Sequence, residues 1–466
     1  MKPEQPGPPF DGRRRELLTL LGALLASGCT TLRPTVVTEP PPGIDTTGPA
    51  PPVIFIHGAF GAKLRRRSDG AEVFPGSVTD MLVSDYTELA LPLDPATALP
   101  LLGDIEPFAL FEEAAGVQFY GSVLRMLEQA GNYVPTEVGT PGKAGDRRQY
   151  VYLFDWRRDL VEAALGLDAF IERIRADHRD PRLKVDIVAH SAGGLVARYF
   201  LLYGGTPLAD SGALRPTMKG AAKVRRLVTL GTPELGTARV AAACIHGEPM
   251  GLLGRVPPEV FATTPGALQL LPMGFDYWLV DEYGQPQPLS AHDVDTWRGL
   301  QIGLFSPVVA RRVAAAGGEG QAGQDWLLLH QRGFELGLLR ARRFTAALWA
   351  AALPASIRLH TIAGDCRPTQ ARLLLESRGG GPSVVAMPQD VRERRRGIDY
   401  EALMLEPGDG VVTQASALAS PLQPSGKKAP RGFGTDIDSA RFICAQHNQL
   451  AVNPQSQREV LRALGR

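Results

Sequence analysis

Ser191 lies in a pattern of small residues that is typical of a nucleophilic serine on a tight turn. The segment Val188-Ala189-His190-Ser191-Ala192-Gly193-Gly194 stands between a short apolar run and the amphipathic stretch 195–200. Small residues two positions before and after the serine allow the strand-to-helix turn to close, although Ala189 stands where Gly is usual. The pattern predicts Ser191 as a nucleophile at a helix N-terminus, and the alternative is a serine that only caps a helix.

A second glycine-rich turn is expected to supply part of an oxyanion hole. The apolar run 53–56 leads directly into His57-Gly58-Ala59-Phe60-Gly61. In lipases the loop after such a strand carries one of the two backbone N–H groups that hold the oxyanion. We therefore expect the N–H groups of Ala59 and Ala192 to be the donors, and His57 to shape the loop. A simple glycine-rich turn is the alternative.

An acid and a base should follow Ser191 in the order Asp and then His. Asp409 lies on a glycine-flanked loop, and Asp365, which follows Ala363-Gly364, is its rival. His447 follows the apolar run 442–444 and is the only histidine after Asp409. In this arrangement His447 would take the proton of Ser191 while the aspartate orients the imidazole. An aspartate between glycines is also a common turn former, so the residues alone leave both aspartates open.

From Val53 onward, short β-branched runs alternate with longer amphipathic stretches. This alternation predicts an α/β fold with a mostly parallel sheet covered by helices on both faces. In such sheets the chemistry lies at the carboxyl ends of the strands, which is where Ser191 is placed. The expected strands are 53–56, 150–154, 185–188, 227–230 and 357–362, with a helix at 160–174.

The strand rhythm stops between about residues 237 and 350, where a helical cap over the active site is expected. A long helical stretch follows the glycine-rich break at 317–320, although Gly333 and Gly337 weaken that prediction. An insertion at this point of the fold excludes water and shapes an acyl-chain pocket.

Several motifs, in chain order, resemble the lecithin:cholesterol acyltransferase family of α/β-hydrolases, with a looser similarity to bacterial triacylglycerol lipases. Together they span nearly the whole chain after residue 52, so their combination is more specific than any one of them. His57 departs from the family, where acyltransferases often have Pro. The resemblance favours Asp409 over Asp365 as the acid. The motifs are 52–64, Phe154-Asp155-Trp156-Arg157, 189–195, Gly231-Thr232-Pro233, 264–272, 408–412 and His447.

The resemblance implies an α/β-hydrolase domain over residues 53–466, with a cap insertion at about 237–350. It implies a lipid-ester hydrolase or O-acyltransferase that forms an acyl-enzyme on Ser191, with no metal or organic cofactor. Water as the acceptor releases a free acid, and an alcohol gives a new ester. Two alternatives stay open: a plain carboxylesterase or triacylglycerol lipase without transferase activity, and a non-catalytic lipid-binding lipoprotein.

The N-terminus resembles an export signal. Arg13-Arg14-Arg15 precede the apolar run 17–25, which is too short to span a bilayer. The run ends in Ala26-Ser27-Gly28-Cys29, which resembles the lipobox of bacterial lipoproteins, although Ala26 replaces the usual Leu. We therefore expect residues 1–28 to be a signal peptide that is removed. A disordered leader with an incidental cysteine is the alternative.

Cys29 is expected to become the lipidated N-terminus of the mature chain. The proline-rich residues 29–52 then predict a tether, because proline blocks helix and central strand and few apolar side chains remain to be buried. The expected location is the outer membrane, with the catalytic domain anchored through the lipid and facing the periplasm.

Charge and cysteine content narrow the partners and cofactors. The formal net charge is +1, and residues 1–28 account for it, so the remainder is formally neutral. A neutral body argues against nucleic acid as a partner, because phosphate binding needs a basic surface. Cys244, Cys366 and Cys444 have no CxxC spacing, so no zinc site is expected. Export would permit one disulfide, but buried free thiols are the interpretation that we prefer.

Overall fold

The computed structural model describes most of the chain from Val36 onward, and this part forms one compact unit by itself. The predicted signal peptide, residues 1–28, and Cys29 lie outside the described residues. Among the residues that are described, no helix is both long and apolar enough to cross a membrane. The described ranges are 36–77, 79–80, 84–114, 117–209, 212, 214–250, 254–273, 278–378, 381–419 and 437–465.

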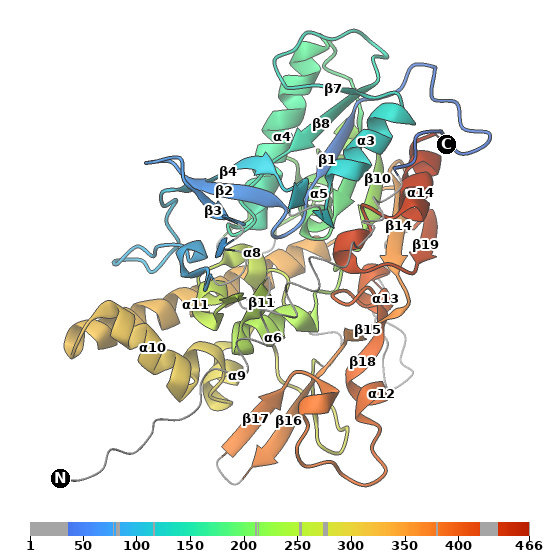
Figure 1. The fold of residues 1–466 in the computed structure, drawn as a ribbon. Coiled ribbons are helices and arrows are strands. Elements are labelled where there is room, and N and C mark those ends of the chain that lie inside the picture. Colours follow the sequence, from blue (N-terminus) through green and yellow to red (C-terminus); the bar gives the residue numbers. More distant parts are fainter. Residues whose placement is uncertain are drawn as a thin grey trace, which may run out of the picture. The chain divides into compact units, whose positions relative to one another are not determined.

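A seven-stranded sheet forms the centre of this unit (Figure 1), in the order β19-β14-β10-β9-β1-β8-β7. All six neighbouring pairs are parallel, and β9, which leads to Ser191, lies in the middle. The predicted α/β-hydrolase fold with a mostly parallel sheet is confirmed. The strands are β1 (Val53–Ile56), β7 (Val134–Pro135), β8 (Arg148–Tyr152), β9 (Val185–His190), β10 (Val224–Leu230), β14 (Arg358–Gly364) and β19 (Ser439–Ile443).

Helices cover both faces of this sheet, which explains why the inner strand β1 is apolar at every position. Successive side chains of a strand point to opposite faces. Val53 and Phe55 pack in a core with helices α3 (Gly121–Gln129) and α14 (Pro454–Gly465). Ile54 and Ile56 pack in a second core with α4 (Leu160–Asp177) and α5 (Ala192–Tyr203). Burial on both faces requires a continuous apolar run rather than an alternating one.

The signature Phe154-Asp155-Trp156-Arg157 holds an excursion that follows β1. The excursion contains β2 (Ala62–Arg66), β3 (Glu72–Phe74), the short helix η1 (Thr87–Leu89) and β4 (Ile105–Leu110). Arg157 is 1% exposed and binds the Asp155 carboxylate with two N–H groups, at 3.0 and 2.7 Å. It also donates to the carbonyl oxygen of Ile105, at 3.2 Å. The motif is therefore structural, because one buried ion pair fixes the excursion to the end of β8.

The insertion between β10 and β14 is largely helical, and it begins with α6 (Ala238–His246). The helix α11 runs without interruption through Gly333 and Gly337. The remaining elements are β11 (Glu248–Met250), β12 (Gly254–Val256), α7 (Pro258–Ala262), α8 (Pro265–Leu268), β13 (Leu279–Asp281), α9 (Val294–Gly299), η3 (Gly303–Phe305), α10 (Pro307–Gly317) and α11 (Gln321–Leu348).

A second insertion, which the sequence did not predict, follows β14 and carries the chain to Asp409. Its strand β16 pairs in parallel with β13 of the first insertion, and β15 pairs antiparallel with β18. The β15–β18 pair returns the chain to the carboxyl end of β14, so Asp409 arrives beside Gly364. The elements are β15 (Arg367–Gln370), β16 (Leu373–Arg378), β17 (Gly381–Val385), η4 (Pro388–Asp390), α12 (Tyr400–Met404), β18 (Leu405–Gly408) and α13 (Gln414–Ala417).

The expectation of a free tether is wrong for residues 36–52, which pack on the catalytic unit. Val37 is buried, and its N–H donates to Oε1 of Gln457 at 3.0 Å. Thr46 is also buried and accepts a hydrogen bond from Asn132 at 3.1 Å. Prolines prevent regular structure here, but they do not prevent extended chain from lying along a folded surface.

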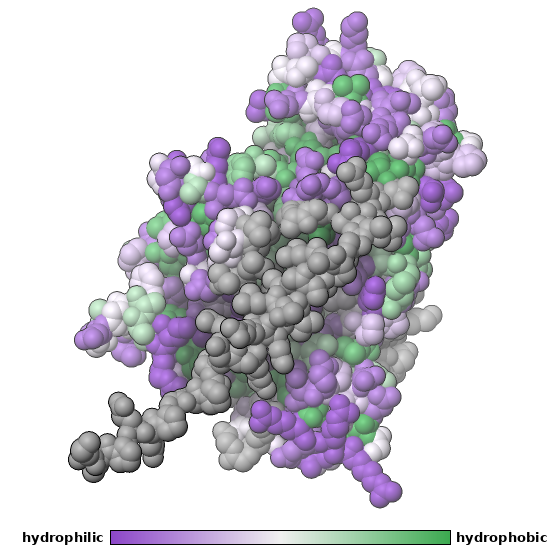
Figure 2. Space-filling view, viewed as in Figure 1, coloured by the Kyte–Doolittle hydropathy of each residue, from purple (hydrophilic) through white to green (hydrophobic). Residues whose placement is uncertain are grey.

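On the face shown in Figure 2, hydrophilic and hydrophobic residues of the unit are interspersed.

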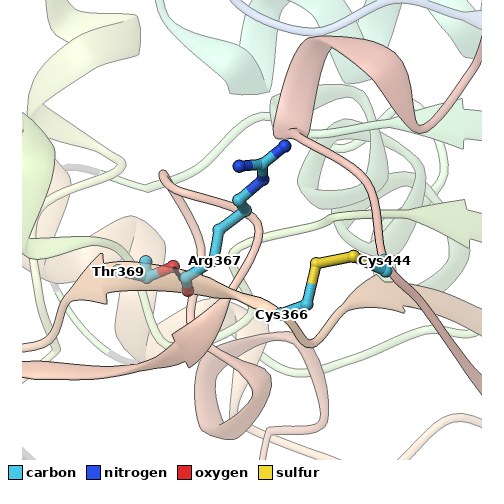
Figure 3. Close-up of a disulfide and its surroundings, with 4 residues drawn as sticks. All are labelled: Cys366, Arg367, Thr369 and Cys444. Atoms are coloured by element: carbon cyan, nitrogen blue, oxygen red, sulfur yellow. Dashed lines mark hydrogen bonds between the residues drawn. A yellow bond between two sulfur atoms is a disulfide. The ribbon is translucent and has the colours of Figure 1, made fainter.

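The preferred interpretation of the cysteines is wrong for two of the three. Cys366 and Cys444 form a disulfide (Figure 3), and only Cys244 is a buried free thiol. The two cysteines follow β14 and β19, which are neighbouring strands. The sequence pattern does not show that these strands pair, so it did not indicate the disulfide. The disulfide joins the start of the second insertion to the segment three residues before His447.

Replacing Cys366 and Cys444 together by serine should lower the free energy of unfolding by about 2–4 kcal/mol, because the unfolded chain regains the freedom of a long loop. Thermal unfolding of the purified domain checks this. A thiol reductant should lower the midpoint of the wild type towards that of the double variant and leave the variant unchanged. Equal unfolding midpoints for the oxidised wild type and the double variant would contradict the assignment.

Candidate active site

Ser191 occupies the strained turn between β9 and α5. Its φ is 53° and its ψ is −128°, a backbone conformation that non-glycine residues rarely adopt and that is held only where the surroundings enforce it. The N–H of Ser191 donates to the carbonyl oxygen of Leu230 on β10, at 2.9 Å. The turn is thus anchored to the neighbouring strand and presents the hydroxyl at the carboxyl end of the sheet.

The structure brings Ser191, His447 and Asp409 together in one hydrogen-bonded row. Ser191 Oγ lies 2.9 Å from Nε2 of His447, and Nδ1 of His447 lies 2.8 Å from Oδ2 of Asp409. His447 begins the short helix η5 (His447–Gln449) just after β19, and Asp409 follows β18. The two loops are also joined by their backbones, because the N–H of His447 donates to the carbonyl oxygen of Asp409 at 2.9 Å. This row is able to draw the serine proton onto the imidazole.

The hydrogen bonds and charge around Asp409 favour its carboxylate form, although the side chain is buried. Burial raises its pKa, but the charge and hydrogen bond of His447 act in the other direction, and the net pKa lies below the ordinary value. Oδ1 accepts two further hydrogen bonds from the N–H groups of Val411 and Val412, at 2.9 and 2.7 Å. A carboxylate with three donors keeps a fixed orientation and stabilises a positive imidazolium.

Asp365, the rival acid, is not hydrogen-bonded to His447. It lies at the end of β14, and its buried Oδ1 has no hydrogen-bond partner among the described residues. Asp409, and not Asp365, lies beside the imidazole of His447, because the second insertion brings it there.

Gly231, the first residue of the Gly-Thr-Pro motif, leaves space for the side chains of Asp409 and His447. A Cβ on Gly231 would lie 2.9 Å from Oδ2 of Asp409 and 3.1 Å from Nδ1 of His447, and the φ of this glycine is +57°. Any side chain at this position would press on the atoms that form the Asp409–His447 hydrogen bond. The motif thus serves the site directly, although none of its side chains takes part in the row.

The loop after β1 passes directly against Ser191. A Cβ on Gly58 would lie 2.6 Å from Cβ of Ser191, so only glycine allows this approach. His57 fixes the loop from inside: its Nδ1 is 2.8 Å from the carbonyl oxygen of Gly58, and its Nε2 accepts the N–H of Phe154 at 3.2 Å. Burial lowers the pKa of His57 to about 4, which suits this neutral, structural state.

The two predicted oxyanion donors lie on either side of Ser191. Ala192 is the first residue of α5, and Ala59 lines the same cavity as Ser191. Within the described ranges, neither of their N–H groups has a hydrogen-bond acceptor in the protein. Two free N–H groups beside a nucleophile are what a developing oxyanion requires.

Ser191 opens into a cavity of about 770 Å³ with a mainly apolar wall. Its polar lining includes Arg239, which is paired with Glu248, and the residues of the row described above. A cavity of this size accommodates an acyl chain. Its aromatic wall comes largely from the excursion after β1 and from the helical insertion after β10: Phe60, Phe74, Phe111, Phe119 and Phe261.

Sequence reasoning missed Tyr120, which lines this cavity and forms a hydrogen bond with His190. Tyr120 stands in a stretch without a recognisable motif, so no local signal marked it.

Among the described residues there is no cluster of His, Cys, Asp or Glu side chains suited to a metal ion.

Comparison with known proteins supports the family resemblance over part of the chain. The family model of lecithin:cholesterol acyltransferase matches residues 141–274, which confirms the resemblance over that segment. The segment includes Ser191 and Gly231 but ends before Asp409 and His447. No curated protein matches the sequence significantly.

Three solved structures are similar to this chain at low sequence identity. A chain in the crystal structure of the Tle4–Tli4 complex is 19% identical with a TM-score of 0.56, covering 89% of this chain and 98% of that one. Lipase BlEst2 of Bacillus licheniformis, in its mature form, is 13% identical with a TM-score of 0.30, covering 93% and 96%. Lipase 1 from Pelosinus fermentans is 11% identical with a TM-score of 0.33, covering 90% and 99%. At these identities the likeness concerns the fold alone, and it is the first of these that shares it clearly.

Asp409→Asn should lower kcat for ester hydrolysis by a factor on the order of 10⁴, because an amide no longer orients and stabilises the imidazolium. Asp365→Asn is the matched control, since it removes the neighbouring carboxylate and should leave kcat nearly unchanged. Steady-state rates on a short-chain nitrophenyl ester measure both variants. A larger loss from Asp365→Asn than from Asp409→Asn would contradict the geometry.

Proposed function

We propose that the chain hydrolyses or transfers the acyl group of lipid esters through an acyl-enzyme on Ser191. The observation that carries the proposal is the hydrogen-bonded row of Ser191, His447 and Asp409 at the wall of an apolar cavity. The match to the lecithin:cholesterol acyltransferase family supports a lipid-ester hydrolase or acyltransferase in general. Water as the acceptor gives a free acid and an alcohol gives a new ester, so the products identify the acceptor.

The chemistry follows from the positions of the groups. Nε2 of His447 takes the proton of Ser191 Oγ as the oxygen attacks the ester carbonyl carbon. The carbonyl oxygen becomes an oxyanion and accepts hydrogen bonds from the N–H groups of Ala59 and Ala192. Collapse transfers the His447 proton to the leaving alcohol and leaves the acyl group on Ser191. Water or a second alcohol then gives up its proton to His447, attacks the acyl-enzyme, and restores Ser191 when the intermediate collapses.

Two features support a long-chain lipid ester as the substrate rather than a small polar one. The wall of the cavity is mainly apolar and aromatic, so it removes an acyl chain from water. Two of the charged side chains on that wall, Arg239 and Glu248, pair with each other, and Arg367 is a further one. An apolar chain therefore gains most of its binding free energy from burial along the phenylalanines.

We also propose that the protein is exported and anchored through lipidated Cys29, on the periplasmic side of the outer membrane. The paired arginines, the short apolar run and the small residues before Cys29 support export. The disulfide between Cys366 and Cys444 adds support, because such bonds persist in oxidising compartments such as the periplasm.

Ser191→Ala should abolish covalent labelling by a fluorophosphonate probe, because the alanine has no oxygen to attack the phosphorus. The matched control is Ser122→Ala, a buried serine on α3 whose hydroxyl has no hydrogen-bond partner among the described residues, and it should label as the wild type does. Labelling is read by gel fluorescence and by peptide mapping. Undiminished labelling of Ser191→Ala would refute the nucleophile assignment.

Product analysis should show acyl groups released from phospholipid, triacylglycerol or short esters, each offered with and without a sterol or other alcohol. The acyl group should appear as free acid, as a new ester, or as both, and Ser191→Ala should give neither product. Chromatography of isotope-labelled lipids measures the partition. No acyl product from any donor, with a folded and labelled enzyme, would contradict the proposed substrate class.

A further inference from the structure

We propose that Tyr120 and His190 act as a positioning pair that holds the oxyanion loop, the nucleophile turn and the base loop in register. The inference rests on the proposed function, because it concerns how the same site is kept ready. Neither residue transfers a proton to the substrate. Their role is to connect three parts of the site that come from distant segments of the chain.

Tyr120 connects the oxyanion loop to the nucleophile turn. It is the residue before α3, and it is buried. Its hydroxyl oxygen accepts the N–H of Gly58 at 3.3 Å, and the same hydroxyl lies 2.8 Å from Nδ1 of His190. Gly58 directly precedes Ala59, and His190 directly precedes Ser191. One phenol therefore contacts the neighbour of an oxyanion donor and the neighbour of the nucleophile.

His190 continues the connection to the base. Its Nε2 lies 3.0 Å from the backbone carbonyl oxygen of His447. A carbonyl oxygen only accepts hydrogen bonds, so Nε2 of His190 must carry the proton. In a neutral imidazole Nδ1 is then the acceptor, and Tyr120 must donate to it. The result is a directed chain from the N–H of Gly58 through Tyr120 and His190 to the carbonyl of His447.

The charge states suit this role. Burial, together with the positive charge that His447 can carry, lowers the pKa of His190 to about 3, so its ring is neutral near pH 7. Burial raises the pKa of Tyr120 above its ordinary value, so the phenol keeps its proton. A neutral His190 does not compete for the Ser191 proton. It also places no second positive charge beside the imidazolium that forms on His447.

The rings add contacts that restrict the same residues. Tyr120 meets His190 edge to face, with centroids 5.4 Å apart, and His190 lies 4.7 Å from the ring of His447. Phe55 of β1 packs on Tyr120 at 5.2 Å. The pair is therefore held by the sheet on one side and contacts the base on the other. Removing the Tyr120 hydroxyl would leave the Gly58 N–H and His190 Nδ1 without partners in a buried place, and both would shift to find new ones.

Tyr120→Phe tests the proposal, because it keeps the ring and removes only the hydroxyl. The second-order rate of fluorophosphonate labelling and kcat on a nitrophenyl ester should both fall about tenfold, with KM little changed, since one buried hydrogen bond to the catalytic frame is lost. The matched control is Tyr203→Phe, which removes a buried hydroxyl that donates to the carbonyl oxygen of Ala347, at 2.8 Å, away from the site. Thermal unfolding confirms that both variants are folded.

The effect should also be shared with His190. His190→Ala should lower the labelling rate, and adding Tyr120→Phe to it should cause little further loss, because both act through the same chain of hydrogen bonds. An unchanged labelling rate in folded Tyr120→Phe, an equal loss in Tyr203→Phe, or fully additive losses in the double variant would overturn the positioning role. An unlabelled wild type would instead overturn the proposed function, and this inference with it.

Discussion

The hydrogen bond between Ser191 Oγ and His447 Nε2 joins two residues that are 256 positions apart, and the architecture is arranged around it. It requires the segments that follow β9 and β19 to meet, although β10 and β14 lie between these two strands in the sheet. The segment after β19 brings His447 to Ser191, and the Asp409–His447 backbone hydrogen bond joins it to the loop after β18.

Two insertions turn this framework into a defined site. The helical insertion after β10 and the excursion after β1 supply the aromatic wall of the cavity into which Ser191 opens. The second insertion supplies the acid, and its position is fixed by the β15–β18 pair and by the disulfide to Cys444. The buried pair of Arg157 with Asp155 performs the corresponding task for the excursion. A parallel sheet with buried strands thus provides stability, and the segments between its strands provide specificity.

The parts of the site that local pattern could predict are those where one short segment does the whole task. Ser191 was recognisable because an apolar strand, a turn of small residues and a helix are consecutive in the chain. The five main strands were recognisable because short β-branched runs alternate with longer amphipathic stretches, and Val53–Ile56 is apolar throughout because it is buried on two faces. The two glycines within α11 were a weaker guide, since packing of the long helix outweighs the cost of each.

The rest depends on contacts between distant segments, which a single sequence does not display. Asp409 and Asp365 both follow plausible strand ends, and only the path of the second insertion separates them. Cys366 and Cys444 are paired because β14 and β19 are neighbours, and Tyr120 matters because its phenol reaches residues 62 and 70 positions away. Residues 36–52 were expected to be a tether from their prolines, but a nearby folded surface gives such a segment somewhere to pack.

The central claim is that an acyl group is carried on Ser191, and trapping that intermediate tests it most directly. The purified protein would be mixed with a short-chain nitrophenyl ester, quenched in acid within the first turnovers, digested and examined by mass spectrometry. The account predicts an acyl mass on the peptide that contains Ser191 and its loss on treatment with hydroxylamine. An acyl adduct on a different residue, or ester turnover that persists in Ser191→Ala, would contradict it.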